Sequence, residues 1–193
     1  MEKLNKKITV NWIIQLVLFA VLIIADRLTK AIAVNCLKGN GEVPVIGQLI
    51  VFRYLENSGA AFGIFQNQQW LFYIITALVL IALAVLWILI IRKLRAYLKL
   101  DGEKFLIKTY NSMIFLNYIF AALAAGAVGN LIDRLTTTYV VDFIYFKFID
   151  FPIFNFADIC VTISAALLVI FFIFVYKEDP NFSIWGSSKK TEE

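Results

Sequence analysis

Four long apolar stretches without a single charged residue are the feature that most limits how this chain can fold. They cover residues 8–25, 70–91, 109–132 and 159–176. A helix needs about 20 mostly apolar residues to cross a hydrocarbon core of about 30 Å, and each stretch is close to that length. We therefore expect an all-α integral membrane protein with four transmembrane helices, formed by a single membrane domain over residues 1–176.

Composition supports a lipid environment and narrows the possible chemistry. Hydrophobic residues make up 61% of the 193 residues, whereas soluble domains contain roughly 45–50%. The sequence has no histidine, which excludes Ser-His-Asp triads and histidine-based zinc sites. Cys36 and Cys160 lie far apart without a CxxC motif, so no metal or redox site is indicated. We expect no cofactor, and a net charge of only +4 gives no reason to expect a nucleic acid partner.

The first apolar stretch also resembles a secretory signal. A basic start precedes it, and residues 31–33 (Ala-Ile-Ala) form an acceptable cleavage site. The stretch is longer than the usual signal core of about 7 to 15 residues. We therefore expect it to be retained as a membrane span.

Lys and Arg residues collect in three segments of the chain. Residues 1–7, the segment 92–108 and the tail 177–193 hold 12 of the 18 basic residues. Because cytoplasmic loops of membrane proteins carry an excess of Lys and Arg, we expect both termini to be cytoplasmic. Residues 26–69 and 133–158 would then lie on the outer side of the membrane. The polar tail is expected to be flexible.

The two outer segments differ in character. Residues 49–54 are rich in β-branched and aromatic residues between Gly47 and the turn signal Asn-Ser-Gly at 57–59, which predicts a short strand or hairpin. The segment 139–156 is aromatic and apolar but is interrupted by charges and by Pro152. We expect this second segment to be a partly embedded interfacial loop.

Two aspartates at the edges of the apolar stretches are the main candidates for chemistry. Asp142 lies in the apolar run 139–146 with no adjacent base, and burial there would raise its pKa. Asp158 stands at the start of the fourth stretch, where the helix dipole favours a carboxylate and where helix capping alone would explain it. Two adjacent carboxyl groups can share one proton, as in aspartic proteases. On local sequence alone, two unrelated interfacial acids remain an equal alternative.

The other acids have simple explanations as neighbours of basic residues. Asp26 at the end of the first stretch would be offset by Arg27 and by Lys30, four residues later. Asp150 is within reach of Lys147 and is expected to be a solvated loop charge.

The segment that ends the third stretch combines small and polar residues. The small residues of 126–130 favour close helix packing. Asn130 and Arg134 are four residues apart, share one helix face and could both point at a site. Asp133 is expected to form a local ion pair with Arg134 and is left out of the candidate pair.

Two other functions fit these residues. Asp26, Asp142 and Asp158 could relay ions in a small proton-coupled membrane transporter. That function predicts acids along a path through the membrane, whereas these acids cluster at one face and the stretch 70–91 is entirely apolar. A structural subunit that packs through Gly126 and Gly129 would instead tolerate the replacement of acids by amides.

Five short motifs are spread from the first apolar stretch to the fourth. They are Asp26-Arg27-Leu28-Thr29-Lys30, Asn57-Ser58-Gly59-Ala60-Ala61-Phe62, Gly129-Asn130-Leu131-Ile132-Asp133-Arg134, Val140-Val141-Asp142-Phe143 and Phe154-Asn155-Phe156-Ala157-Asp158. On these motifs and their order, the sequence resembles the prolipoprotein signal peptidase family, signal peptidase II, over residues 11–176.

The resemblance implies an aspartic endopeptidase of the membrane that uses no metal. It implies that Asp142 and Asp158 form the catalytic dyad. The supporting or substrate-binding residues that it implies are Asp26, Asn57, Asn130, Arg134 and Asn155. The sequence departs from the family pattern, away from the implied catalytic residues, at Ser58, Gly63 and Ser164.

The resemblance also implies partners and a location. Substrates are expected to be lipid-modified prolipoproteins, cut immediately before a cysteine that carries diacylglycerol. The enzyme is expected to be a multi-pass monomer of the bacterial cytoplasmic membrane, in contact with membrane lipid, with its active site at the outer face.

Overall fold

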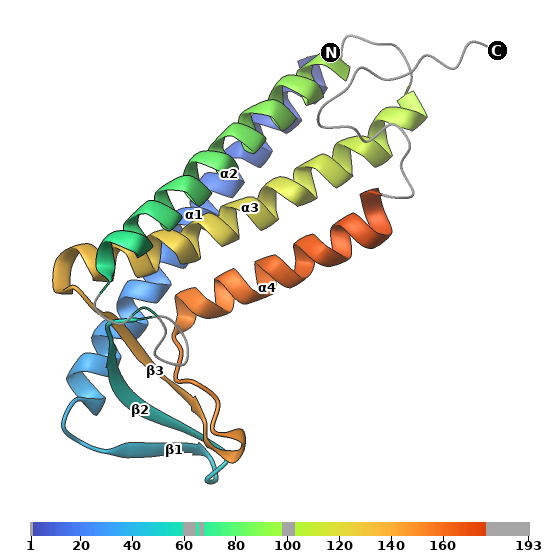
Figure 1. Ribbon diagram of the computed structural model, residues 1–193. Helices are drawn as coiled ribbons and strands as arrows, with labels where there is room; N and C mark the ends of the chain where they lie inside the picture. The colour runs from blue at the N-terminus through green and yellow to red at the C-terminus, as the bar shows by residue number, and fades with distance from the viewer. Residues whose placement is uncertain (1, 60–64, 66–67, 98–102, 177–193) are drawn as a thin grey trace.

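The computed structural model describes residues 2–59, 65, 68–97 and 103–176, with side chains for all of these except 2–5, 96–97 and 103–108. The tail 177–193, predicted to be flexible, lies outside the described residues. Four long helices form an elongated bundle, and a small sheet lies beyond one end of it (Figure 1). The helices are α1 (Glu2–Leu37), α2 (Gln69–Tyr97), α3 (Glu103–Thr137) and α4 (Phe156–Ile170), the last continued by a π-helical turn, Phe171–Tyr176.

Each of the four helices contains a segment that is long and apolar enough to cross a membrane. The predicted fold of four membrane helices with a small β element is therefore confirmed. Helix α1 runs on to Leu37, so it does not end near Asp26 as predicted. It continues because Asp26 and Lys30 lie one turn apart and pair within the helix, which removes the reason for it to stop. Because α1 does not end at Asp26, this carboxylate does not lie at the negative end of the helix dipole, contrary to expectation.

The sheet has three antiparallel strands in the order β1-β2-β3. Strand β2 contains the predicted segment 49–54 from residue 50 onward and forms a hairpin with β1, as predicted. The segment predicted to be an interfacial loop is shorter than expected, because its first half is strand β3. Its β-branched and aromatic residues suit a strand, but only pairing with β2, far away in sequence, decides this. The strands are β1 (Glu42–Ile46), β2 (Ile50–Asn57) and β3 (Val140–Phe146).

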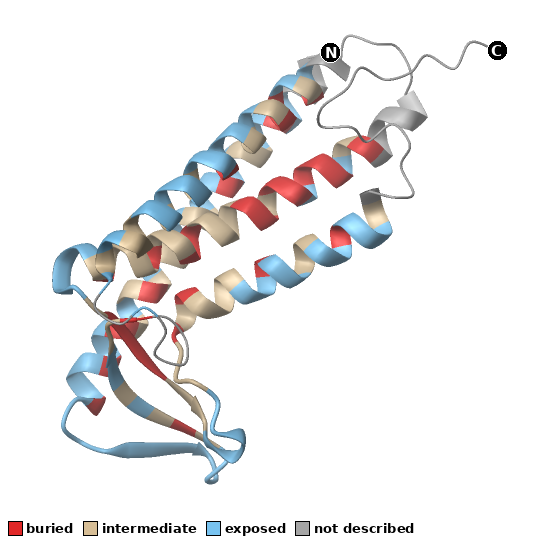
Figure 2. Cartoon of the chain, in the orientation of Figure 1, coloured by how far each residue is buried: buried red, intermediate tan, exposed pale blue. Residues whose placement is uncertain are grey.

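Helix α3 is the central helix of the bundle. Of its membrane-span segment 56% is buried, against at most 17% for the other three helices. Figure 2 shows this contrast, with α3 mostly buried and the outer faces of α2 and α4 exposed. Those outer faces carry large apolar side chains, including Leu78 and Val169, as expected for surfaces in contact with lipid.

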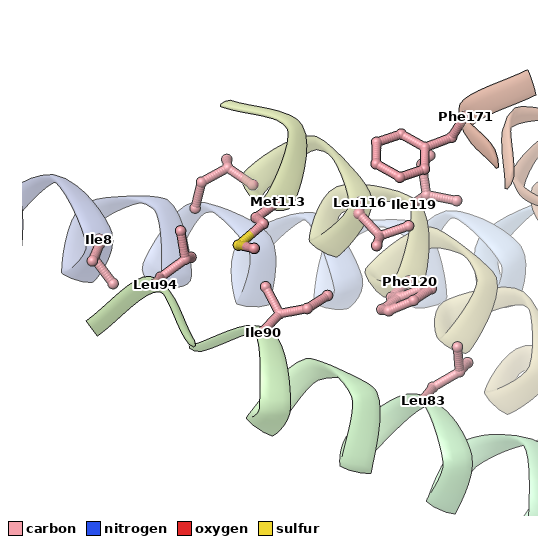
Figure 3. Packing of buried hydrophobic residues seen from close by; sticks show 10 residues of the cluster. Ile8, Leu83, Ile90, Leu94, Met113, Leu116, Ile119, Phe120 and Phe171 are labelled. Atoms are coloured by element: carbon pink, nitrogen blue, oxygen red, sulfur yellow. The ribbon is translucent and has the colours of Figure 1, made fainter. Parts of the chain in front are cut away.

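Two buried apolar clusters hold the parts together. The larger cluster joins α1, α2, α3 and the π-helical turn through residues such as Ile90, Met113 and Phe171 (Figure 3). The smaller cluster packs Ala33 and Leu37, at the end of α1, against Val141 and Phe143 of β3. This second contact fixes the sheet relative to the bundle, and therefore fixes β3 relative to the start of α4.

Glycines allow the central helix to approach its neighbours. A Cβ atom on Gly126 would lie 2.6 Å from the carbonyl oxygen of Ala157 in α4, and one on Gly129 would lie 2.6 Å from Oδ2 of Asp26. Both distances are shorter than any tolerable contact. The predicted role of these glycines in helix packing is therefore confirmed, and Gly129 leaves room for the carboxylate of Asp26.

Candidate active site

The candidate residues meet where the bundle joins the sheet. Strand β3 carries Asp142 beside the start of α4, which carries Asp158. The two aspartates are 16 positions apart in the sequence, and the loop between them folds back so that Phe154 bridges to Ile144. The fold therefore places β3 and the start of α4 at the same end of the molecule, where the bundle meets the sheet (Figure 1).

The start of helix α4 is built as a capping box. Asn155 is the N-cap residue, and its side-chain oxygen accepts a hydrogen bond from the backbone N–H of Asp158 at 3.0 Å. In return Oδ2 of Asp158 accepts from the backbone N–H of Asn155 at 3.0 Å. Asp158 is thus the third residue of the helix, one turn beyond the cap, near the positive end of the helix dipole. Asp158 therefore does help to cap the helix, and this contact uses only its Oδ2, so Oδ1 is available for other contacts.

Asn155 connects the two candidate carboxyl groups. Besides its contacts with Asp158, its side-chain Nδ2 donates to Oδ1 of Asp142 at 2.7 Å. The second oxygen of Asp142 accepts from Asn57 at 2.8 Å, and Oδ1 of Asp158 accepts from Asn130 at 2.8 Å. Every carboxyl oxygen of this pair therefore receives one hydrogen bond from an asparagine.

Asp142 is a carboxyl group with a strongly altered proton affinity. Only 1% of its surface is exposed, and this burial is the main cause that raises its pKa to about 7 from an ordinary value near 3.8. The negative charge of Asp158 raises the pKa further, while the hydrogen bonds from Asn57 and Asn155 oppose the rise. Asp142 can therefore keep its proton at a pH well above the range in which an exposed aspartate is ionised.

Arg134 lines the same cavity as Asp142 and Asp158, but it does not form an ion pair with Asp133. Its guanidinium stacks 4.3 Å from the ring centre of Phe72 and donates to the carbonyl oxygen of Gly59 at 3.4 Å. Asp133 points away from it, because neighbouring residues on a helix face directions about 100° apart. The predicted pair of Asp133 with Arg134 was therefore wrong: Asp133 forms ion pairs with Arg27 and Lys30.

Asp26 lies behind the site rather than in it. Its Oδ1 accepts from the backbone N–H of Ala157 in the first turn of α4 at 3.0 Å, and its Oδ2 lies 2.9 Å from Nζ of Lys30. As predicted, Lys30 offsets the charge of Asp26, but Arg27 does not. Asp26 thus joins α1 to the start of α4 and supports the position of Asp158 from behind.

Lys147 and Asp150, in and after the short helical turn that follows β3, have separate partners among the described contacts. Asp150 accepts a hydrogen bond from the hydroxyl of Tyr145 at 2.6 Å, whereas Lys147 pairs with Glu42 at 2.7 Å. Lys147 turns toward Glu42 because strand β1 lies beside this loop in the folded sheet. Asp150 is nevertheless exposed, as predicted for a loop charge.

A cavity of about 710 Å³ ends at the two aspartates. Five of the seven predicted site residues line it, whereas Asn155 and Asp26 lie behind the wall. The rest of the wall is mostly apolar and comes from β3, the following loop and α4. Such a cavity can hold an apolar chain and present one point of it to a pair of carboxyl groups. The polar lining is Asn57, Asn130, Arg134, Asp142 and Asp158, and the apolar lining includes Phe146, Phe151, Phe154, Ile159 and Ile163.

Lys30 is the buried polar residue whose importance was missed from the sequence. Its side chain is 1% exposed and contacts Asp26, Asp133 and Asn130. The sequence did hold a signal, because Lys30 occurs in a motif that also contains Asp26. It was interpreted only as a partner for Asp26, since its contacts on α3 are about 100 residues away.

Comparisons with known proteins agree with this geometry. The family model described as signal peptidase (SPase) II matches residues 18–174. Lipoprotein signal peptidases of Clostridium tetani and Caldanaerobacter subterraneus are each 38% identical to this chain, over 86% and 82% of its length and 94% and 95% of their own.

Two solved structures of bacterial membrane enzymes, determined by the in meso method, have the same fold. The one at 1.9 Å resolution has a TM-score of 0.64 and 33% identity, with 83% of this chain and 93% of that chain covered. The one at 2.3 Å resolution has a TM-score of 0.63 and 31% identity, with coverage of 82% and 87%. These matches extend across all four membrane helices and decide against the transporter considered above. The chain belongs to the signal peptidase II family.

Proposed function

We propose that this chain is a lipoprotein signal peptidase that cleaves with Asp142 and Asp158 as its catalytic dyad. The observation that carries this proposal is that Asn155 hydrogen-bonds both carboxyl groups at the polar end of a largely apolar cavity. The membership of the chain in a family of membrane peptidases supports the same function.

The two carboxyl groups have different surroundings, which suggests different roles. Asp142 is buried on a strand, and its pKa of about 7 allows it to carry a proton at neutral pH. Asp158 lies in the first turn of α4, where the helix dipole favours a negative charge. Asp142 is therefore the acid and Asp158 the base at the start of the reaction.

The reaction needs no covalent intermediate with the enzyme. Asp158 accepts a proton from a water molecule as the water oxygen attacks the scissile carbonyl carbon, and Asp142 donates its proton to the carbonyl oxygen. The tetrahedral intermediate then collapses and the carbon–nitrogen bond breaks. Asp158 returns its proton to the leaving amine while Asp142 takes one back from a hydroxyl of the intermediate, which restores the starting state.

The supporting residues hold this pair and the substrate. Asn57 and Asn155 donate to Asp142, and Asn130 donates to Asp158. Arg134 supplies a positive charge on the cavity wall, where it balances the single negative charge of the dyad. Asp26 secures the first turn of α4.

The shape and lining of the cavity favour a lipid-modified peptide as the substrate. A volume of about 710 Å³ with a mostly apolar wall suits an apolar signal segment and acyl chains, whereas a polar peptide would lose its hydration there. The relatives are named lipoprotein signal peptidases. The substrates are therefore prolipoproteins with a diacylglyceryl cysteine, and cleavage occurs immediately before that cysteine.

The same proposal includes the position of the enzyme in the membrane. A single membrane domain over residues 1–176 lies in the bacterial cytoplasmic membrane as a monomer surrounded by lipid. Both termini and the polar tail are cytoplasmic, since 12 of the 18 basic residues lie in segments on that side. The sheet and the dyad then lie at the outer face, where acyl chains can stay in the bilayer during cleavage.

Cleavage of a diacylglyceryl prolipoprotein by the purified protein in detergent tests this function. Asp142→Asn and Asp158→Asn are each expected to abolish cleavage while the variants remain folded, as judged by circular dichroism and thermal melting. Asp150→Asn is the matched control, because it makes the same change at an exposed loop residue outside the cavity. Its backbone φ of 49° is one that Asn also adopts. Clear cleavage by either dyad variant would contradict the proposal.

A further inference from the structure

Lys30 is the largest fully buried side chain among the described residues. Its Nζ lies 2.9 Å from Oδ2 of Asp26 and 2.8 Å from Oδ2 of Asp133, and it donates to Oδ1 of Asn130 at 3.0 Å. An ammonium group has three hydrogens to donate and accepts none. The three contacts therefore use its full capacity, and they come from two different helices.

The contact with Asn130 determines which way that amide faces. Because an ammonium group cannot accept a hydrogen bond, the atom of Asn130 that faces Lys30 must be the oxygen. The Nδ2 group of Asn130 is then directed at Oδ1 of Asp158, at 2.8 Å. A flipped amide would present its oxygen to the carboxylate of Asp158, and the two acceptors would repel each other.

The same constraint extends to a second amide. The oxygen of Asn130 also accepts a hydrogen bond from Nδ2 of Asn155, at 3.1 Å. That Nδ2 group donates in addition to Oδ1 of Asp142, at 2.7 Å. Lys30 touches neither carboxyl group of the proposed dyad. The orientation of the Asn130 and Asn155 amides, two of the three that donate to the dyad, nevertheless follows from its position.

We propose that Lys30 is a positioning residue that orients the Asn130 and Asn155 amides so that each donates a hydrogen bond to one carboxyl group of the dyad. This inference rests on the proposed function, because it assumes that Asp142 and Asp158 are catalytic. Lys30 itself does not contact the substrate and takes no proton from it.

Lys30 also completes a neutral group of charges beside the dyad. Lys30 and Arg27 balance the two carboxylates of Asp26 and Asp133. Without Lys30 this group would carry an excess negative charge, and Asp142, whose pKa Lys30 lowers, would bind its proton more tightly. The charged groups that face the site from each element are Asp26, Arg27 and Lys30 of α1, Asp133 and Arg134 of α3, Asp142 of β3 and Asp158 of α4.

The test compares Lys30→Met with Arg27→Met in a detergent cleavage assay over a range of pH. Arg27 is the matched control because it pairs with the same Asp133 but contacts neither asparagine. For Lys30→Met, kcat is expected to fall about 100-fold with little change in KM, since the dyad is no longer held in its reactive geometry. The limb of its pH profile that Asp142 sets should move to higher pH, because Lys30 lowers the pKa of Asp142. Arg27→Met is expected to keep kcat within about fivefold and to shift this limb less, because the Arg27 side chain is 40% exposed and its charge is screened by solvent.

A folded Lys30→Met variant with the kcat and the pH profile of the wild type would overturn the proposal. If this variant does not melt cooperatively, Lys30→Met/Asp26→Asn replaces it, because the double variant removes one charge of each sign. The Asn side-chain oxygen can still accept from the N–H of Ala157. The same fall in kcat is expected, but without the pH shift, because Arg27 and Asp133 still balance each other. A kcat equal to that of the wild type would count against the role of Lys30.

A measurement on the wild-type protein tests the orientation of the Asn130 amide even if neither variant folds. In protein labelled with 15N-lysine and 13C,15N-asparagine and aspartate, solid-state NMR should transfer magnetisation from the Asn130 side-chain NH2 to the carboxyl carbon of Asp158. Transfer from that NH2 group to Nζ of Lys30 instead would mean that the amide faces the other way, and would overturn the proposal.

The failure of this inference can be told apart from the failure of the proposed function. If Asp142→Asn and Asp158→Asn abolish cleavage but Lys30→Met has no effect, the dyad stands and the role of Lys30 is wrong. If either dyad variant still cleaves, the proposed dyad is wrong, and the premise of this inference fails with it.

Discussion

Four side-chain amides, three of them buried and one half-buried, divide the bundle into two regions that are held together differently. At the sheet end, the half-buried Asn130 and the buried Asn155 donate to carboxyl and amide oxygens. In the half of the bundle nearer the start of α1, Gln15 and Asn117 are fully buried. Neither makes a hydrogen bond among the residues that the structure describes.

The two regions are stabilised by different kinds of contact. The half with Gln15 and Asn117 is held together by the larger apolar cluster, in which close packing of side chains is the main stabilising contact (Figure 3). The sheet end relies on directional hydrogen bonds and ion pairs, each of which admits one arrangement. Catalysis requires side chains that are held in one arrangement. Replacing an amide at the sheet end should therefore reduce activity far more than replacing an amide in the other half.

The largest effect is expected from Asn155→Ala. This change removes the donor to Asp142 and the cap of α4 together, so kcat should fall about 100- to 1000-fold, as when a donor to a reacting group is lost. Asn117→Ala makes the same chemical change in the other half and should leave kcat at the wild-type value. Cleavage assays on both variants check this, and an equal loss in both would remove the distinction between the regions.

The dependence of stability on pH should also separate the regions. The folded-state pKa of Asp142 is raised to about 7, so its contribution to stability is full below pH 4 and is lost as the pH rises through 7. Relative to Asp142→Asn, the wild type should therefore lose stability over this window, by at most about 1.4 kcal/mol per pH unit. Thermal melts at several pH values measure it. Gln15→Leu should differ from the wild type by the same amount at every pH, because no titrating group is removed.

Gly129→Ala should disturb the sheet end through sterics alone. The new Cβ would lie 2.6 Å from Oδ2 of Asp26, so α3 must move away from α1 or the carboxylate must leave Lys30. Overpacking of this kind costs about 1–3 kcal/mol, and cleavage should fall with stability. The melting temperature and kcat are the measurements. Wild-type values for both would show that the contacts of Asp26 are less constrained than the structure indicates.

The smallest effect is expected from Gln15→Leu. The buried amide of Gln15 has no partner among the described residues, so an apolar side chain of similar size should stabilise the bundle by about 1 kcal/mol. Cleavage should not change, because the cavity at Gln15, of about 190 Å³, is separate from the dyad. A loss of stability in denaturant or thermal melts would mean that this amide is satisfied after all.

Much of the fold could be predicted because a bilayer imposes simple rules. The length of an apolar run identifies a span, as for residues 70–91 within α2, without any knowledge of its neighbours. The ends of α1 and α3 could not be predicted in this way, because the charges after the apolar runs are neutralised by ion pairs within α1 and between α1 and α3. Strand β3 was missed for the same reason, since its identity depends on pairing with β2.

The candidate site shows the same limit. Asp142 and Asp158 could be picked out as acids at the membrane edge, and the motifs added Asn57, Asn130 and Asn155, which the structure places around them. Their catalytic roles remain predictions. Lys30 could not be ranked above an ordinary helix ion pair, because its burial and its contact with Asn130 appear only when α1 and α3 pack together.

The capping box at the start of α4 has a consequence for biosynthesis. Asp158 and the asparagine that joins it to Asp142 both belong to the last membrane helix to leave the ribosome. Under the proposed dyad, a nascent chain that has inserted only its first three spans contains one carboxyl group without its partner. On this proposal, cleavage can begin only after α4 has been inserted, because the base of the dyad and the N-cap asparagine arrive with that helix.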